Sequence, residues 1–326
     1  MIKKCSLLAI IVILTEMEEI ILSIVGGLVL FLFAVNSLSE TIKMVVGGSA
    51  NKWIMQFTRN TFSSILVGLV VTALLDSSSA VIIITIVFVN SKILTFRQAM
   101  GIVLGANIGT TISSQIIAMD IGKYSPLLLI IGFTLLFISK SERVNNTGKI
   151  ILYFGVLFFG LFTMENAVEP LRDESYFIEW LKKTEHPLTG ALIGALITLI
   201  IQSSSATVGM AIILSKKGLL SLAGGIAVML GAELGTCSDT LLATIKGSRA
   251  ALKTGLFHLL FNVLSIIIGL LLFYPFLHVV QWISQNAPIE RAVANAHMIF
   301  NVSGVLLFAW TVPLFEKMLN RFLPDR

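Results

Sequence analysis

Apolar runs of two lengths alternate along this chain of 326 residues, and each length predicts a different relation to a membrane. A helix needs about 17–25 apolar residues to span a bilayer. The runs that we predict to cross, with their flanks, are 20–35, 96–119, 126–138, 150–162, 219–245, 256–273 and 293–312. Shorter runs at 62–75, 81–89, 188–201 and 207–214 form two pairs, and each pair encloses a Ser-Ser-Ser triplet. We predict that each pair is a re-entrant helical hairpin.

The two triplets belong to a duplication with an offset of 126 residues. Residues 76–80 read Asp-Ser-Ser-Ser-Ala, and residues 202–206 read Gln-Ser-Ser-Ser-Ala. Residues 105–111 read Gly-Ala-Asn-Ile-Gly-Thr-Thr, and residues 231–237 read Gly-Ala-Glu-Leu-Gly-Thr-Cys. Polar residues repeated at fixed spacing in an apolar chain are typical of duplicated transporters, whose binding site lies at the interface between the repeats.

The Gly-rich motifs interrupt two of the runs that are long enough to cross. We therefore predict that both transmembrane helices are broken near mid-membrane. If each hairpin returns to the side that it entered, the first repeat crosses three times, so the second repeat must be inverted. Charge supports this arrangement, because 14 of the 23 Lys and Arg residues fall on one side. The positive-inside tendency makes that side, which includes the C-terminus, cytoplasmic.

The predicted fold is an all-α polytopic membrane protein of two inverted-topology repeats, each with a re-entrant helical hairpin and a broken transmembrane helix. Residues 17–145 form the first transmembrane repeat, 146–250 form the core of the second, and 251–326 are C-terminal transmembrane helices that complete it. Residues 1–16 are an N-terminal extension with the charged and apolar parts of a signal peptide but no small-residue cleavage site. Translation from Met17 would also explain them.

Composition agrees with a membrane protein and excludes several other classes. Hydrophobic residues make up 56% of the chain and charged residues 13%, whereas soluble domains carry about 25% charged residues. The formal net charge is +5, but the Lys and Arg residues lie in short loops between apolar runs, so no surface for nucleic acid is expected. The two cysteines, Cys5 and Cys237, have no CxxC spacing and predict neither a disulfide framework nor a metal site.

The serine triplets are suited to bind an oxyanion such as phosphate. A hairpin tip with three hydroxyls also exposes backbone N–H groups, and the arm after each triplet begins a helix whose N-terminus attracts anions. Neither triplet contains Lys or Arg, so a co-transported cation would neutralise the anion. The predicted phosphate-binding residues are Ser77, Ser78, Ser79, Ser203, Ser204 and Ser205.

Oxygen atoms near the two predicted breaks are suited to that cation. Free carbonyls in 105–111 and 231–236, together with side-chain oxygens, are hard ligands that favour Na⁺ over a transition metal. Two carboxylates join this set because acids inside a membrane are costly and usually functional. Asp239 is left out because it lies outside the repeated motif. The predicted Na⁺-binding residues are Asp76, Gln202, Asn107, Thr110, Thr111, Glu233 and Thr236.

The paired motifs resemble those of the bacterial branch of the sodium-dependent phosphate cotransporter family. Residues 258–262, His-Leu-Leu-Phe-Asn, and residues 297–301, His-Met-Ile-Phe-Asn, are similar to the HxxFN segments of its bacterial members. Two residues depart from the family pattern, since Asp76 stands where the family has Gln and Glu233 where it has Asn. Many bacterial members carry a PhoU-like domain after the membrane part. Residues up to Arg326 contain none, so a separate PhoU-like regulator is a candidate partner.

The resemblance implies a secondary active transporter that brings phosphate into the cell with Na⁺, by alternating access across the cytoplasmic (inner) membrane. It implies phosphate at the serine triplets, Na⁺ as coupling ion at the motif oxygens, and no resident cofactor. One alternative is a symporter or exporter of another oxyanion coupled to H⁺ through Asp76 and Glu233. Another is a phosphate sensor that does not transport.

An enzyme is the least supported reading of the chain. A serine nucleophile needs a base within reach, and no spacing places His258 or His297 beside either triplet. Neither histidine has an acidic residue at helical spacing. We therefore interpret both as structural hydrogen-bonding groups, because buried polar side chains usually find a partner.

Overall fold

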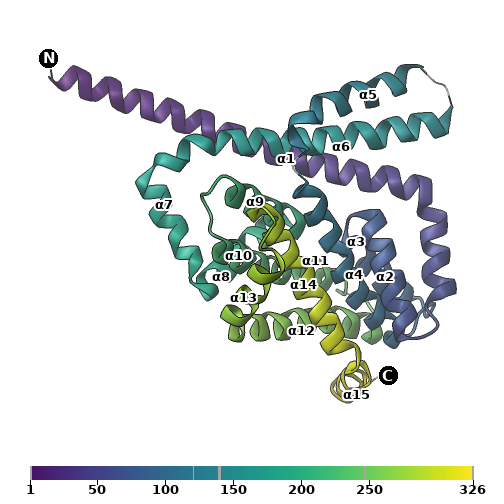
Figure 1. The fold of residues 1–326 in the computed structure, drawn as a ribbon. Coiled ribbons are helices and arrows are strands. Elements are labelled where there is room, and N and C mark those ends of the chain that lie inside the picture. The colour runs from purple at the N-terminus through teal and green to yellow at the C-terminus, as the bar shows by residue number, and fades with distance from the viewer. Residues whose placement is uncertain (1, 120, 139–140, 246, 325–326) are drawn as a thin grey trace.

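In the computed structural model all regular elements of the described residues, 2–119, 121–138, 141–245 and 247–324, are helices (Figure 1). The side chains of 2–16, 43, 46–53, 55, 172–173, 175 and 180 are outside the description. Short 3₁₀ helices lie at Gly122–Tyr124, Glu169–Asp173 and Lys183–Glu185. The α-helices are α1 Ile2–Phe57, α2 Thr61–Leu75, α3 Ser78–Asn90, α4 Phe96–Ile117, α5 Ser125–Ile138, α6 Glu142–Ala167, α7 Ser175–Lys182, α8 Pro187–Ile201, α9 Ser204–Lys216, α10 Leu222–Gly235, α11 Cys237–Leu242, α12 Arg249–Leu271, α13 Phe273–Ile283, α14 Ile289–Ala309 and α15 Val312–Phe322.

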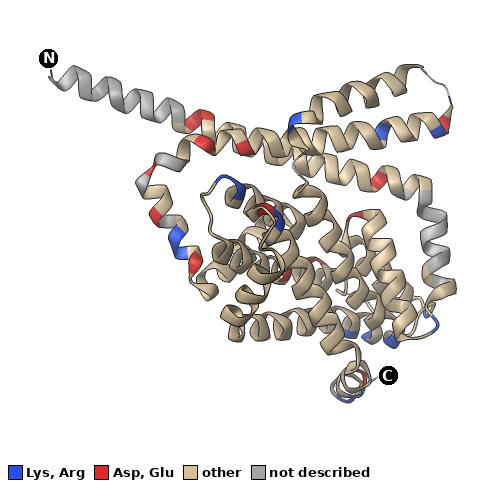
Figure 2. Cartoon of the chain, in the orientation of Figure 1, with Lys and Arg blue, Asp and Glu red and all other residues tan. Residues whose placement is uncertain are grey.

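Several of these helices are suited to cross a bilayer, which makes the chain a multi-pass membrane protein. Among the described residues, five stretches are long and apolar enough, and they lie in α1, in α6 with the 3₁₀ turn after it, and in α4, α12 and α14. Their bounds are Met17–Ile42, Phe96–Ile117, Glu142–Leu171, Arg249–Leu271 and Ile289–Ala309. Figure 2 shows that charged residues gather on the outer helices and loops, while the central helices carry few.

The short apolar runs also form helices close to their predicted bounds. α2 and α3 flank the first serine triplet, and α8 and α9 flank the second. The predicted crossing at 126–138 is shorter than a membrane is thick. α5 has 14 residues, or about 21 Å at 1.5 Å per residue, against a hydrocarbon core of about 30 Å. The inverted topology was inferred by counting 126–138 as one of three crossings in the first repeat, so the inversion stays a prediction.

Two apolar clusters form the core, one around α4 and one around α10. The first contains Ile102 and Val103 of α4 with side chains from α2, α3, α12 and α15. The second contains Met229 and Leu230 of α10 with side chains from α1, α6, α9 and α13. α14 contributes to both clusters and therefore joins the two halves of the protein.

The sequence duplication is also a duplication of helix packing. Gly105 of α4 lies against the carbonyl of Ile65 in α2, and Gly231 of α10 lies against the carbonyl of Ala191 in α8. These residues match at the offset of 126. A Cβ atom at either glycine would overlap the carbonyl oxygen. The glycines are therefore used for close approach of two helices, as small residues often are in membranes.

The predicted break in the first repeat is wrong, and the break in the second is confirmed. α4 is one continuous helix of 22 residues, because its glycines pack against α2 and do not interrupt its hydrogen bonds. In the second repeat α10 ends at Gly235 and α11 begins at Cys237. Thr236 Oγ1 donates to the Glu233 carbonyl at 2.9 Å, and Ser238 Oγ donates to the Gly235 carbonyl at 2.9 Å. Such bonds compete with regular helix bonds.

The close approach of α8 and α10 predicts that Gly231→Ala destabilises the protein. Forcing a methyl group against a backbone carbonyl costs about 1–3 kcal/mol, so the thermal unfolding midpoint in detergent should fall. The matched control is Gly26→Ala in α1, where nothing lies within 4 Å of the added atom. Equal midpoints for the two variants would contradict the packing argument.

Candidate functional site

Two left-handed residues end the helices before the serine triplets. Asp76 closes α2 with φ 50° and ψ 32°, and Gln202 closes α8 with φ 61° and ψ 29°. Residues other than Gly rarely adopt this left-handed backbone conformation, and those that do are concentrated at functional sites. The chain turns there and starts the next helix at once, so both triplets lie at the junction of two helix ends.

The first serine of each triplet is the N-cap of the following helix. Ser77 Oγ accepts a hydrogen bond from the Ala80 N–H, and Ser203 Oγ accepts one from the Ala206 N–H, both at 3.2 Å. This is the usual role of Ser before a helix. The two turns therefore share backbone conformation and capping, as the repeated sequence suggests. We call residues 76–80 the first serine turn and residues 202–206 the second.

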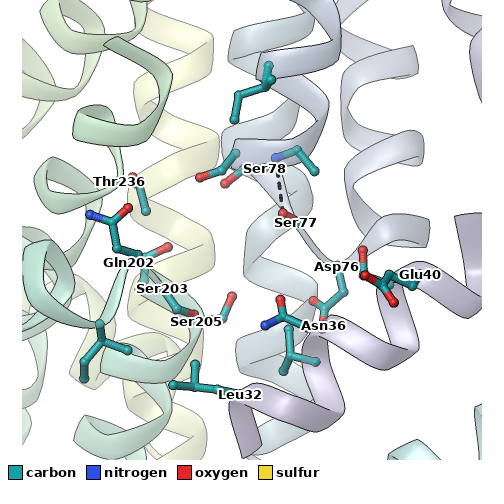
Figure 3. A pocket seen from close by; sticks show the side chains of 17 residues that line it. Leu32, Asn36, Glu40, Asp76, Ser77, Ser78, Gln202, Ser203, Ser205 and Thr236 are labelled. Atoms are coloured by element: carbon teal, nitrogen blue, oxygen red, sulfur yellow. Dashed lines mark hydrogen bonds between the residues drawn. The ribbon is translucent and has the colours of Figure 1, made fainter. Parts of the chain in front are cut away.

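Both serine turns line one polar cavity of about 540 Å³ (Figure 3). The sequence predicted that they would meet, and the fold brings them together. All six predicted phosphate-binding serines lie on its wall, with three of the predicted Na⁺-binding residues. The complete lining is Leu32, Val35, Asn36, Ser39, Glu40, Asp76, Ser77, Ser78, Ser79, Ala80, Ile83, Ile201, Gln202, Ser203, Ser204, Ser205 and Thr236.

The charged groups on the wall of this cavity are acidic. Glu40 and Asp76 contribute carboxylates, and none of the lining residues is Lys or Arg. The favourable groups for an anion are hydroxyls and the N-terminal ends of α3 and α9, whose dipoles attract negative charge. An anion in this cavity would therefore face two carboxylates unless a cation or a proton neutralised them.

Two hydrogen bonds to carboxylates connect the first serine turn with other helices. Ser113 Oγ of α4 donates to Asp76 Oδ1. Ser79 Oγ donates to Asp239 Oδ2 of α11 at 3.1 Å, so the turn of one repeat contacts an acid of the other. Ser113 and Asp239 match at the offset of 126. Asp239 lies two residues beyond the Gly-rich motif and faces Ser113 in the repeat alignment, so no repeated residue marked it as part of the site.

The other predicted cation-binding residues lie away from the cavity wall. Asn107 Nδ2 donates to the Val103 carbonyl at 2.9 Å, and Thr110 Oγ1 donates to the Ala106 carbonyl at 3.0 Å. Thr111 Oγ1 donates to the Ile108 carbonyl at 2.8 Å. Because α4 is continuous, its carbonyls in 105–111 are not free as predicted. Of the residues in the two Gly-rich motifs, Thr236 alone is among the described residues that line the cavity.

Glu233 lies behind the cavity, in a buried hydrogen-bonded bridge. His297 Nε2 of α14 lies 2.6 Å from Glu233 Oε1, and His297 Nδ1 lies 2.7 Å from Ser114 Oγ of α4. Asn301 Nδ2 donates to the same carboxylate oxygen at 3.3 Å. His297 thus has an acidic partner from another helix, which spacing along the sequence did not show. The Ser114–His297–Glu233 bridge joins α4, α14 and α10.

His258, in the HxxFN segment at 258–262, makes related contacts with no acid among its hydrogen-bond partners. Its Nδ1 lies 2.8 Å from Thr240 Oγ1, and its Nε2 lies 3.1 Å from Asn262 Nδ2. Thr240 matches Ser114 at the offset of 126. Both histidines therefore bond a hydroxyl that lies three residues after a Gly-rich motif. A structural hydrogen-bonding role, as interpreted from the sequence, describes His258 fully.

Three residues of α1 on the cavity wall were missed by the sequence analysis. Asn36, Ser39 and Glu40 line the cavity beside Asp76. They follow the first apolar run, where polar residues are expected simply because the run ends. Neither a repeat nor a motif marked them.

The buried bridge predicts that His297→Ala destabilises the protein by about 3–5 kcal/mol, because it leaves a buried carboxylate without its main partner. The double variant Glu233→Gln/His297→Ala should recover part of this loss, since no charge is then buried. Thermal unfolding of the purified protein in detergent measures both. If single and double variants lost equal stability, the carboxylate would not depend on His297.

Comparison with known proteins shows the family of the chain. A model of the family described as Na⁺/Pi-cotransporter matches residues 30–166 and 174–284. The chain is 29% identical over 312 residues to an uncharacterized protein, YqeW, of Bacillus subtilis, covering 94% of this chain and 99% of that protein. No solved structure matches the chain.

Two further relatives have names that refer to phosphate. One is "Putative inorganic phosphate export protein YjbB" of Salmonella typhimurium, 28% identical over 261 residues, which are 79% of this chain and 47% of that protein. The chain thus spans about half the length of this relative. The other is human sodium-dependent phosphate transport protein 2B, 34% identical over 105 residues, which are 31% of this chain and 15% of that protein. Because the family model takes in both serine turns and both Gly-rich helices, the chain belongs to the Na⁺/Pi-cotransporter family, whose members are transporters of phosphate and not enzymes.

Proposed function

We propose that this protein is a Na⁺-coupled symporter that moves inorganic phosphate across the cytoplasmic membrane by alternating access. The observation that carries the proposal is a cavity that both serine turns line, in which none of the described lining residues is Lys or Arg. Hydroxyls and helix N-termini can hold an oxyanion, and the anion stays exchangeable because no fixed cation binds it. Na⁺ then supplies the missing positive charge and the driving force.

In this proposal phosphate lies between Ser77–Ser79 and Ser203–Ser205. Ser78, Ser204 and Ser205 contribute hydroxyls, and Ser79 does so when it releases Asp239. Ser77 and Ser203 keep their capping bonds. Na⁺ is the coupling ion, with Asp76, Gln202 and Thr236 as ligands on the cavity side. A role for Asn107, Thr110, Thr111 or Glu233 in binding Na⁺ requires a different state of the transport cycle, because none of the four lines the cavity in this structure.

We further propose that the two repeats have inverted topology and that α2–α3 and α8–α9 are re-entrant hairpins. The matched packing of α2 with α4 and of α8 with α10 supports the repeat. α2, α3, α8 and α9 have 15, 13, 15 and 13 residues, and this shortness supports hairpins that do not cross. The excess of Lys and Arg on one side supports a cytoplasmic C-terminus. A separate PhoU-like protein would be the cytoplasmic regulator.

A second candidate function is phosphate export, favoured by the name of the Salmonella relative. Inward movement of each net positive charge gains about 2.3 kcal/mol per 100 mV, so uptake is favoured where Na⁺ brings excess charge. Export would need another coupling ion or an outward gradient. H⁺ coupling through Asp76 and Glu233 belongs to this alternative, and so does another oxyanion. A sensor would bind phosphate and not transport it.

Uptake of radiolabelled phosphate into proteoliposomes tests the proposal. We expect accumulation under an inward Na⁺ gradient and none when choline replaces Na⁺ at the same pH. Arsenate should compete and sulfate should not, because only arsenate shares the protonation and charge of phosphate. Accumulation driven by a proton gradient alone would instead support the alternative coupling ion, and binding without accumulation would support a sensor.

The second serine turn predicts that Ser205→Ala weakens phosphate binding. A hydrogen bond to a charged group contributes about 1.5–3 kcal/mol, which corresponds to about a 10- to 100-fold rise in half-saturating phosphate. Ser215→Ala on the same helix, α9, is the control, since Ser215 is buried and away from the cavity. Similar phosphate dependence in both variants would remove Ser205 from the site.

A further inference from the structure

One wall of the cavity is built by α1, which carries none of the repeated motifs. Asn36, Ser39 and Glu40 are spaced three and four residues apart, so they share one face of the helix. All three line the cavity with Asp76. Figure 3 shows Asn36 and Glu40 on either side of Asp76, at the first serine turn. Four oxygen-bearing side chains therefore gather at one end of the cavity.

Ser39 is the unusual member of this group. It is 5% exposed, and its hydroxyl has no hydrogen-bond partner among the described residues. Thr41, two residues later, donates to the Ser37 carbonyl at 2.8 Å. A hydroxyl in this part of α1 can therefore bond to its own helix, and Ser39 does not. Buried hydroxyls usually have a partner. Thr72, Ser125, Ser215 and Ser265 are also buried without one, but of these five described residues Ser39 is the one that lines this cavity, so a ligand there is its natural partner.

The described residues that line this wall also include no basic partner for its carboxylates. Glu40 and Asp76 are both acidic, and the lining contains no Lys or Arg. Elsewhere the protein does neutralise acids, since Glu165 of α6 lies 2.7 Å from Lys216 Nζ and 3.3 Å from Lys217 Nζ. Two carboxylates on one wall of a cavity attract a cation by Coulomb's law.

We propose that α1 and the first serine turn form a Na⁺ subsite, with oxygens from Asn36, Ser39, Glu40 and Asp76. Carboxylate, amide and hydroxyl oxygens are hard ligands, suited to a hard cation and poorly suited to a transition metal. The subsite rests on the proposed symport function and adds α1 to its machinery. A cation held there neutralises both carboxylates next to Ser77 and so admits an anion to the serine turns.

The test compares Glu40→Gln and Ser39→Ala with two control variants of the same helix. Glu19→Gln removes an exposed carboxylate far along α1, and Ser37→Ala removes a neighbouring hydroxyl; neither residue lines the cavity. The first readout is the shift of the thermal unfolding midpoint in detergent as NaCl replaces choline chloride at constant ionic strength. Ligands that bind only the folded protein raise this midpoint with concentration. The second is the Na⁺ dependence of phosphate uptake.

We expect half-saturating Na⁺ to rise at least about ten-fold in Glu40→Gln and Ser39→Ala, the loss typical when a metal site loses a supporting group. Both controls should match the wild type, and Glu40→Asp should restore part of the Na⁺ response. Wild-type half-saturation in Glu40→Gln and Ser39→Ala would overturn the subsite and leave symport intact. A wild type that ignores Na⁺ in both readouts would overturn the subsite together with Na⁺ coupling. If Mg²⁺ stabilised the wild type in place of Na⁺, and this stabilisation were lost in Glu40→Gln, the assignment to Na⁺ would be wrong.

Discussion

Four helix ends meet inside an apolar protein, and the rest of the structure depends on satisfying their polar backbone groups. α2 and α8 end where α3 and α9 begin, at the two serine turns. Irregular backbone at membrane depth is stable only where it faces protein or a water-filled cavity. Ser77 and Ser203 satisfy some of these backbone N–H groups by capping α3 and α9. The remaining groups face the cavity of about 540 Å³. The backbone groups that have no partner within the protein therefore face one cavity, where an anion can bind.

Close helix packing holds these turns opposite each other. Gly105 and Gly231 let α4 and α10 approach the backbones of α2 and α8 closely, and α14 joins the two halves through both apolar clusters. The Ser114–His297–Glu233 bridge fixes the same three helices by hydrogen bonds. A buried carboxylate is expensive unless it is paired. Glu233 therefore ties the position of α14 to the break at Thr236, three residues further along the chain.

The two repeats are alike in backbone and unlike in charge. Asp76 and Gln202 hold the same left-handed position, and Ser113 and Asp239 hold another matched pair. In the first pair the acid belongs to the first repeat, and in the second pair it belongs to the second repeat. Both acids nevertheless lie at the first serine turn, since Asp76 is part of it and Asp239 accepts a hydrogen bond from Ser79. Negative charge is therefore concentrated at one turn. This asymmetry supports a division in which the first turn, with α1, lies nearer the cation.

The sequence by itself determined the all-helical membrane class, the helices flanking each serine triplet and the family. These features follow from run length, period and repeat, which are local in the chain or fixed by a constant offset. The tertiary structure decided the rest. It kept α4 continuous, because whether a glycine bends a helix or packs it depends on the neighbouring helix. It paired His297 with Glu233 and brought Asn36, Ser39 and Glu40 to the cavity, because contacts between distant helices leave no periodic trace in the chain. Most residue types of the candidate site could be predicted from the repeated motifs, whereas helix packing decided which of these side chains line the cavity.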